Sequence, residues 1–495
     1  MHTTPLARRT LLKGAALAVV GYSVSQAAWT TGAAQAADLS RTPRLDGTLE
    51  LSPAVRSQFS TDFGHFVTAQ PAAVLRPGSV KDIQAMMRFA FDKRIKVAVN
   101  GQSGEGADTE SHSNYGQALA PGGLQIDAQS MSTIHRISAD SAWVDMGVTW
   151  ARLVDAALPH GLTVPALTDY LHLSIGGTVS VGGVGASVQR YGLQSDIISE
   201  IEIVNGRGEV SLASRTRNAQ LFHAALAGAG QAGVITKLRV ALVPAKGTAT
   251  ITNLFYSNVQ DYAADQKALM AAGRYDHHSG EVLRNADDSG WLYKIELGSY
   301  LTPPEQGPAP ETLDGLRDDR ALRTSFTLPY RDWAFRIDEF AVYLREAGHW
   351  AQKKPWLSLL IPGDKVVEFV NATMPELTKA DLGDGFCLLS PLDPAKIKSP
   401  MFVLPHSSDG TVFFFDLLNF YSPETTGFEA MLERNRRLYD RLVAMGGKRY
   451  IIGAVPNMTV TDWKRHFGKQ YDVLQRNKAA FDPRYLLAPG QNFFG

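Results

Sequence analysis

The stretch from Thr168 to Gly185 constrains the fold of this chain more than any other. It reads TDYLHLSIGGTVSVGGVG, with the carboxylate of Asp169 a few residues before the first pair of glycines. Glycine has no side chain, so its backbone forms tight turns and can bring N–H groups close to a phosphate. We therefore expect a glycine turn beside a carboxylate, an arrangement suited to chemistry on a bound cofactor.

Composition limits the remaining possibilities. A chain of 495 residues is too long for one compact core, so two domains are expected. Basic and acidic residues number 49 each, which argues against a polyanion-binding surface, and we expect no nucleic-acid partner. The single cysteine, Cys387, excludes intramolecular disulfides, zinc–thiolate sites and iron–sulfur clusters. We expect it to be a small buried hydrophobic residue and predict no metal site.

The first 37 residues have the pattern of a targeting segment. Arg8 and Arg9 precede an apolar stretch over 14–24, and small residues end in an A-x-A pattern over 34–37. Adjacent arginines are typical of the twin-arginine route. We expect an exported protein, extracellular or periplasmic; an ordinary secretory signal and an uncleaved anchor are the alternatives. The apolar run is too short to predict a membrane span, so no stable membrane insertion is expected after signal removal.

The pattern of apolar residues predicts mixed α and β structure. Residues 80–91 have helical spacing and lie between two short strands, which predicts a strand–helix–strand unit. The two flanking strands are expected over 71–77 and 95–99, and further strands over 124–126, 143–148, 197–204, 210–212, 237–243, 251–256 and 411–417. Further helices are expected over 150–160, 221–227, 264–272 and 428–444.

Several motifs together point to one family. PAAVLRP from Pro71, SHSNYGQALAPGG from Ser111 and TDYLHLSIGGTVS from Thr168 resemble the FAD domain of the vanillyl-alcohol-oxidase-type flavoenzymes, and within them the cytokinin dehydrogenases. FHAALAGAGQAGVITKLRVAL, KPWLSLLIP, DWKRHFG and FDPRYLLAPGQ extend the resemblance over most of residues 60–495.

The resemblance implies an α+β fold with two domains. Residues 38–245 and 446–495 would form a PCMH-type FAD-binding domain. Residues 246–445 would form a substrate domain, an antiparallel sheet covered by helices.

The resemblance also implies FAD as the cofactor. The glycines at 176–177 and 228–233 would cradle it. The residues expected to contact it are His112, Ser113, Gln117, Thr168, Ser174, Gly176, Gly177, Ser180, Gly233, Ile235 and Gln491. In the family, a histidine in a Gly-His-Ser motif carries the flavin covalently, and His112 matches it although Ser111 replaces the glycine. An alternative register places Gly101–Ser103 there and leaves His112 as a surface-loop histidine.

Two acids and one aromatic residue are implied in the substrate pocket. Asp169 matches the family position that hydrogen-bonds the substrate amine, and we expect a dry pocket that suits it as a general base. The family's second acid lies in a Tyr-Val-Glu-Gly context. Here the comparable residues are HHSGEV over 277–282, in which Glu281 could stand in for that acid. Trp356 would wall a slot for an aromatic ring. His277 and His278 are expected to be a solvated pair.

The resemblance predicts an exported FAD-dependent oxidoreductase of cytokinin dehydrogenase type. It would oxidise the C–N bond of an N6-substituted adenine, with Asp169 as proton acceptor and oxygen or a quinone as electron acceptor. A flavin oxidase of the same fold acting on an alcohol or sugar, and a cofactor-free exported binding protein, are the alternatives. No G-x-G-x-x-G lies between a strand and a helix, and G-x-S-x-G is absent, so neither a Rossmann enzyme nor a serine hydrolase is indicated.

Overall fold

The computed structural model describes residues 20–23, 28–31, 39–101, 111–285, 287 and 289–495. The chain divides into two compact units, Met1–Arg44 and Leu45–Gly495. The first unit contains an antiparallel sheet of β1 (Val20–Ser23), β2 (Ala28–Thr31) and β3 (Leu39–Arg41). Arg8, Arg9 and the A-x-A pattern of the predicted signal peptide lie outside the described residues.

The second unit begins with the predicted strand–helix–strand arrangement. Its first sheet has the order β4 (Thr48–Glu50), β5 (Ala73–Arg76), β7 (Leu124–Asp127), β6 (Val97–Asn100), with β5 and β6 parallel to β7. The helix α2 (Val80–Lys93) connects β5 to β6 and buries Ile83, Met86 and Ala90. Those positions recur at helical spacing, which explains why this helix was predictable.

A five-stranded antiparallel sheet follows. Its order is β12 (Val210–Ser214), β11 (Ile198–Val204), β13 (Val234–Ala241), β9 (Ser141–Asp145), β8 (Ile134–Ile137). The short strands β10 (Leu162–Thr163) and β14 (Val243–Pro244) pair beside it. The helices of this part of the chain are α1 (Pro53–Gln58), α3 (Trp150–Ala157), α4 (Ile175–Val181), α5 (Val188–Tyr191) and α6 (Ala219–Ala225).

The third large sheet has eight strands. Its order is β18 (Thr324–Pro329), β15 (Thr248–Tyr256), β17 (Trp291–Leu301), β16 (His277–Arg284), β20 (Phe386–Leu392), β21 (Val412–Leu418), β19 (Leu357–Pro362), β22 (Lys448–Arg449). All neighbouring strands are antiparallel.

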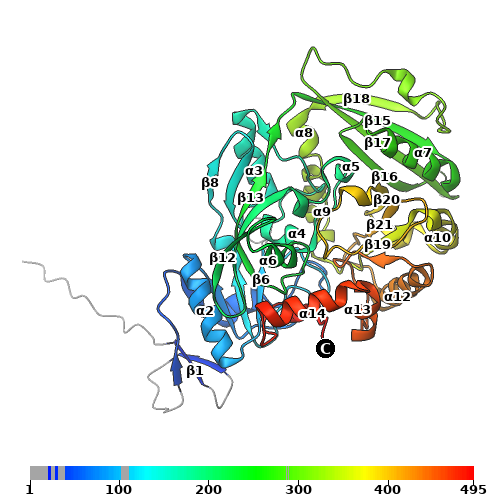
Figure 1. Cartoon of the computed structure of the whole chain (residues 1–495). Helices are drawn as coiled ribbons and strands as arrows, with labels where there is room; N and C mark the ends of the chain where they lie inside the picture. The colour runs from blue at the N-terminus through cyan, green and yellow to red at the C-terminus, as the bar shows by residue number, and fades with distance from the viewer. Residues whose placement is uncertain (1–19, 24–27, 32–38, 102–110, 286, 288) are drawn as a thin grey trace, which may run out of the picture. The chain divides into compact units, whose positions relative to one another are not determined.

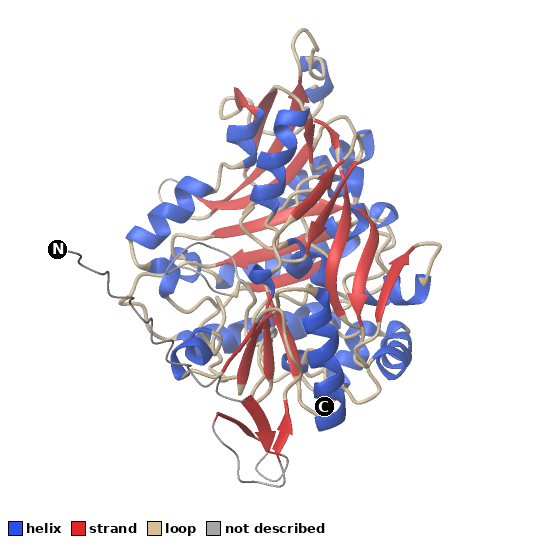
Figure 2. Cartoon of the chain, turned by 90° about the vertical axis from the view of Figure 1, so that its left-hand side faces the viewer, coloured by secondary structure: helices blue, strands red, loops and turns tan. Residues whose placement is uncertain are grey.

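Three helices cover one face of this sheet. They are α7 (Val259–Ala272), α10 (Val366–Thr373) and α12 (Phe428–Ala444), and Figure 1 shows them along the sheet. Tyr262, Phe369 and Leu438 from these helices pack against Phe413 and Phe415 of β21 in one buried core. The expected helix-covered antiparallel sheet is therefore confirmed, and Figure 2 shows its long strands beside the helices.

The C-terminal segment returns to the four-stranded sheet of β4, β5, β7 and β6. After α13 (Val460–Phe467) and α14 (Gln470–Phe481), Leu487 bridges Val97 of β6. Val97 N donates to Leu486 O at 2.9 Å, and Ala488 N donates to Val97 O at 2.8 Å.

The domain limits at 245 and 446 stay a prediction. The remaining helices are α8 (Tyr330–Ala334), α9 (Asp338–Glu346) and α11 (Lys379–Leu382).

One local prediction was wrong. Gly176 and Gly177 do not form a turn but lie in the first turn of α4, with Ser174 at the N-cap position. A Cβ on Gly176 would stand 2.9 Å from both Cβ and the carbonyl oxygen of Met146, so glycine allows the helix to start against that residue.

No helix in the described part of the chain is long and apolar enough to cross a membrane.

Candidate active site

One large cavity of about 600 Å³ lies in the second unit. The residues predicted individually to contact the cofactor or the substrate all line it: His112, Ser113, Gln117, Thr168, Asp169, Ser174, Gly176, Gly177, Ser180, Gly233, Ile235, Glu281, Trp356 and Gln491. These residues come from the loop before β7, the segment around α4, the strand β13 and the residue before it, the strand β16, the residue before β19, and the C-terminal segment. The structure therefore brings together segments that are far apart in the sequence.

Backbone without side chains forms part of the cavity lining. Gly176, Gly177, Gly230 and Gly233 all line it. The nearest atom to a Cβ on Gly177 would be Ser174 Oγ, at 2.8 Å, so this glycine keeps the lining open. Gly228, expected in the same cradle, is not among the lining residues. A Cβ there would lie 1.9 Å from Ala224 O, so this glycine serves the close turn after α6.

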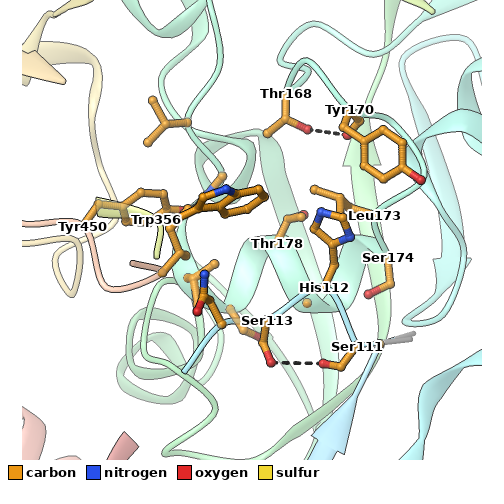
Figure 3. A pocket seen from close by; sticks show the side chains of 18 of the residues that line it. Ser111, His112, Ser113, Thr168, Tyr170, Leu173, Ser174, Thr178, Trp356 and Tyr450 are labelled. Carbon is orange, nitrogen blue, oxygen red and sulfur yellow. Dashed lines mark hydrogen bonds between the residues drawn. The ribbon is translucent and has the colours of Figure 1, made fainter. Parts of the chain in front are cut away.

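His112 lies in an aromatic cluster at the cavity. Its ring stacks on Phe63 with centroids 3.9 Å apart and on Tyr170 at 5.2 Å. Figure 3 shows His112, Tyr170 and Trp356 among the side chains that line the cavity. Desolvation by the surrounding protein, together with the cations Lys354 and Arg345, lowers the pKa of His112 to about 3, so the ring is neutral at neutral pH. In the alternative register, residues 102 and 103 lie outside the described residues.

Hydrogen bonds fix several polar side chains of the cavity lining. Ser111 Oγ and Ser113 Oγ are 3.0 Å apart, and Thr168 Oγ1 donates to Tyr170 O at 3.1 Å, as the dashed lines in Figure 3 show. Ser180 Oγ donates to Gly176 O at 2.7 Å within α4. Trp356 Nε1 donates to Asn419 O at 3.0 Å, which fixes the indole in the wall.

Asp169 is paired with an arginine that the sequence did not suggest. Arg336, in the turn between α8 and α9, contacts the carboxylate Oδ1 through Nη2. The side chain of Asp169 is 39% exposed where it lines the cavity and forms this ion pair, and the expectation of a dry pocket around it stays a prediction. Desolvation opposes the charge of Arg336, but the negative charges of Asp169 and Glu296 raise its pKa overall. The guanidinium therefore holds the carboxylate in a defined position at the cavity.

A charged wall, formed by Glu281 of β16 with Lys294 and Glu296 of β17, lines the same cavity. Lys294 Nζ lies 2.6 Å from Glu281 Oε2 and 3.7 Å from Glu296 Oε2. Desolvation disfavours the charge of Glu296, but its hydrogen bond with His277 and the cation Lys294 lower its pKa to about 2. Glu281 therefore faces the cavity as one partner of an ion pair rather than as an isolated acid.

The neighbouring histidines are buried, not solvated as expected. His277 and His278 are 4% and 3% exposed, because β16 lies inside the sheet between β17 and β20. His277 Nε2 is 3.0 Å from Glu296 Oε1, and His278 bonds to Gln266 of α7 on the other face. The pair points to opposite faces of the strand, as alternation requires. The described residues contain no group of three His, Cys, Asp or Glu side chains that could hold a metal ion.

Next to the charged wall, on the neighbouring strands of the same sheet, lies an apolar wall, formed by Phe386 and Leu388 of β20 and by Phe414 and Leu418 of β21. A single acid, Asp416, stands among these residues and is only 3% exposed. Sequence reasoning missed it, although a lone carboxylate inside the apolar run VFFFDLL over 412–418 was a visible signal. Cys387, on the other face of β20, is buried as expected.

The cavity fits a large cofactor with a phosphate-bearing tail. Its volume lies within the range of ligand and cofactor sites, about 300–1,000 Å³, and glycine backbone from α4 and from the segment before β13 lines it. Gln117, Ser174, Gly177 and Gln491 offer polar groups to such a ligand at separate points of the lining.

Comparisons with known proteins agree with this geometry. A family model described as an FAD binding domain matches residues 71–214, and one described as cytokinin dehydrogenase 1, FAD and cytokinin binding, matches residues 274–494. Fold, cavity and family models together define an FAD-dependent oxidoreductase.

Relatives cover almost the whole chain. An uncharacterized oxidoreductase, ORF5 in the fasciation locus of Rhodococcoides fascians, is 36% identical over 87% of this chain and 95% of its own length. Cytokinin dehydrogenase 1 of Oryza sativa subsp. japonica is 31% identical over 90% and 92%, and cytokinin dehydrogenase 1 of Arabidopsis thaliana 29% over 88% and 80%. The chain belongs to the cytokinin dehydrogenase family.

Proposed function

We propose that this enzyme oxidises the C–N bond of an N6-substituted adenine that carries an allylic substituent, releasing adenine and an aldehyde. The observation that carries the proposal is the position of Asp169. It lies in the segment that resembles the family's substrate-binding run, and it lines the same cavity as the glycines proposed to hold the cofactor. The names of the plant relatives support this substrate class.

FAD, when bound, supplies the acceptor for a hydride from the carbon beside the amine nitrogen. Asp169 accepts the N–H proton of the same amine, so the substrate loses two electrons and two hydrogens and becomes an imine. Addition of water to the imine then cleaves the C–N bond. Arg336 contributes by holding the Asp169 carboxylate where the amine would lie.

The two walls of the cavity suit different parts of such a substrate. The charged wall of Glu281, Lys294 and Glu296 offers donors and acceptors to the ring nitrogens of adenine, and the apolar wall suits the hydrocarbon substituent. Trp356 offers a ring face at the cavity. One bound substrate would therefore contact the charged wall on β16 and β17 and the apolar wall on β20 and β21.

A second candidate is oxidation of an alcohol or sugar by an enzyme of the same fold. Two features favour it. Gly280 matches the glycine of the family's Tyr-Val-Glu-Gly pattern, which leaves Ser279 where that pattern has its acid. Glu281, two residues after Ser279 along β16, is paired with Lys294.

For either substrate, we propose that oxygen or a quinone reoxidises the enzyme.

We also propose that FAD is attached through His112. The neutral state of the ring supports this, because only an unprotonated nitrogen can form the bond. After acid precipitation, the flavin colour should stay with the wild-type protein and be released from His112→Ala. Release of the colour from the wild type would contradict covalent attachment.

The substrate proposal is tested by product analysis. Purified enzyme is incubated with N6-isopentenyladenine, and separately with a panel of primary alcohols and sugars, in the presence of a quinone acceptor. We expect adenine and the unsaturated aldehyde in equal amounts from the first, and no oxidation of the panel. Oxidation of the panel alone would support the second candidate instead.

A further inference from the structure

Asp416 is a buried acid whose presence is not explained by the packing of the sheet, and it takes no part in the proposed proton transfer. It occupies the middle of β21, opposite Ser358 of β19 and Leu388 of β20 in the strand register. Its side chain is on the same face of the sheet as Phe414 and Leu418, so it lies in the apolar wall of the cavity.

One of its two carboxyl oxygens has a hydrogen-bond partner among the described residues. Ser358 Oγ donates to Asp416 Oδ1 at 2.6 Å, and within the described part of the chain this is the only hydrogen bond of the Asp416 side chain. The second oxygen is left for whatever occupies the cavity. Burying a carboxyl group among apolar side chains costs free energy, and an apolar residue here would avoid that cost. A structural role therefore explains the hydrogen bond of Oδ1 with Ser358 but not the presence of the second carboxyl oxygen.

The charged and titratable groups around Asp416 come from several elements. Asp169 faces it from the segment before α4, Cys387 stands on β20 and Tyr450 follows β22. Desolvation raises the pKa of Asp416 to about 8 in spite of the Ser358 hydrogen bond, and the charge of Asp169 raises it further. A neutral carboxyl group can both donate and accept a hydrogen bond, which matches a hydroxyl group.

We propose that Asp416 determines substrate specificity by hydrogen-bonding a hydroxyl group on the carbon substituent of the amine. The apolar wall would surround the hydrocarbon part of the substituent, and Asp416 would be its single polar contact there. A site built to bond a hydroxyl discriminates strongly against the analogue that lacks it, since the polar group of the site is then left unpaired. This inference rests on the proposed function, because it presupposes an amine substrate held near Asp169.

The test compares two N6-substituted adenines that differ only by one hydroxyl on the allylic substituent. Their kcat/KM values are measured for the wild type, for Asp416→Leu and for Asp416→Asn, with flavin content and circular dichroism as checks of folding. We expect the wild type to prefer the hydroxylated compound by at least about tenfold. Asp416→Leu should lose this preference through a higher KM for the hydroxylated compound, while the other compound is still turned over.

Asp416→Asn retains a donor and an acceptor at nearly the same size, so it should keep most of the preference and serves as the matched variant if Asp416→Leu does not fold. Equal kcat/KM values for the two compounds in the wild type, or an unchanged preference in Asp416→Leu, would overturn the inference and leave the proposed function intact. If neither adenine is oxidised by the wild type, the proposed function itself fails.

Discussion

At the scale of single residues, the cavity holds two acids in contrasting surroundings. Asp169 is partly exposed and paired with Arg336, whereas Asp416 is buried among apolar side chains with Ser358 as its hydrogen-bond partner. Environments that differ this much separate the roles of two carboxyl groups in one site. These surroundings agree with the proposed roles, in which the first accepts a proton and the second binds without ionising.

Replacing Asp169 by asparagine should slow substrate oxidation by a factor of about 10²–10⁴, the usual contribution of a positioned general base. The amide has nearly the same shape, but it cannot take up the amine proton. The measurement is the rate of flavin reduction in a stopped-flow experiment without oxygen. Asp338→Asn is the matched control, because Asp338 lies on α9 near Arg336 and pairs with His172 at 3.1 Å. A rate within threefold of the wild type in Asp169→Asn would rule out the assigned role.

Asp416→Asn should change how stability depends on pH. The acid has a pKa near 3.9 when unfolded and a pKa of about 8 when folded, so the folded state keeps a proton that the unfolded state loses. The stabilisation is complete below pH 4 and is lost as the pH rises towards 8. Between pH 5 and pH 8, the wild type should lose roughly 3 kcal/mol more unfolding free energy than the variant.

Urea denaturation of both proteins at the two pH values provides the measurement. Parallel pH profiles would show that Asp416 is ionised in the folded protein. The difference between the two slopes matters here, not the stability at any one pH, so a modest packing change in the variant does not affect the result.

At the scale of elements, the helices with a strong apolar period were predicted well and the glycine-rich segment was not. The helix α12 has the bounds expected from its sequence, and α2 differs by two residues at its end. A turn is expected at residues 176–177 because glycine backbone readily forms tight turns. Packing of α4 against Met146 outweighs that preference, and no local pattern shows it.

The site was predictable where one short segment carries it and unpredictable where distant segments meet. Asp169, His112 and Gln491 stand in motifs that resemble the family. Arg336 pairs with Asp169 across 167 residues of sequence, and Lys294 meets Glu281 through the register of β16 and β17. Such pairs arise from sheet order and loop paths, which a single sequence does not reveal.

Gly177→Ala should reduce the flavin content without destabilising the protein. Alanine favours helix over glycine by up to about 1 kcal/mol, so any loss of cofactor would come from the new methyl group in the cavity lining. Its nearest neighbour would be Ser174 Oγ at 2.8 Å. The ratio of flavin to protein absorbance and the thermal midpoint are measured together.

Gly247→Ala is the matched control, since its Cβ would meet nothing closer than 3.7 Å. It should retain the full flavin content. An unchanged flavin content in Gly177→Ala would place the cofactor away from α4.

At the scale of the whole molecule, the second unit contains the entire cavity. Segments as far apart as His112 and Gln491 meet in it, and the two family models together span most of the unit. The cavity therefore depends on the second unit folding as a whole. This fits a route that carries proteins across a membrane already folded.

We propose that residues 1–37 direct export and that this export depends on the paired arginines. A fusion of residues 1–37 to a reporter that is active only when exported in the folded state should reach the outside of the cytoplasmic membrane. Replacing Arg8 and Arg9 with lysine should block this, because the twin-arginine route reads that pair. A wild-type fusion that gives no active reporter outside the membrane would contradict this route and favour an ordinary secretory signal instead.

The central claim is that this cavity joins a flavin to an amine held at Asp169. Titration of the oxygen-free enzyme with N6-isopentenyladenine, followed by the visible flavin absorbance, tests it most directly. We predict that one equivalent bleaches the wild-type flavin and that Asp169→Asn stays oxidised on the same timescale. A flavin that stays oxidised with every N6-substituted adenine, yet is bleached by an alcohol or a sugar, would contradict the account.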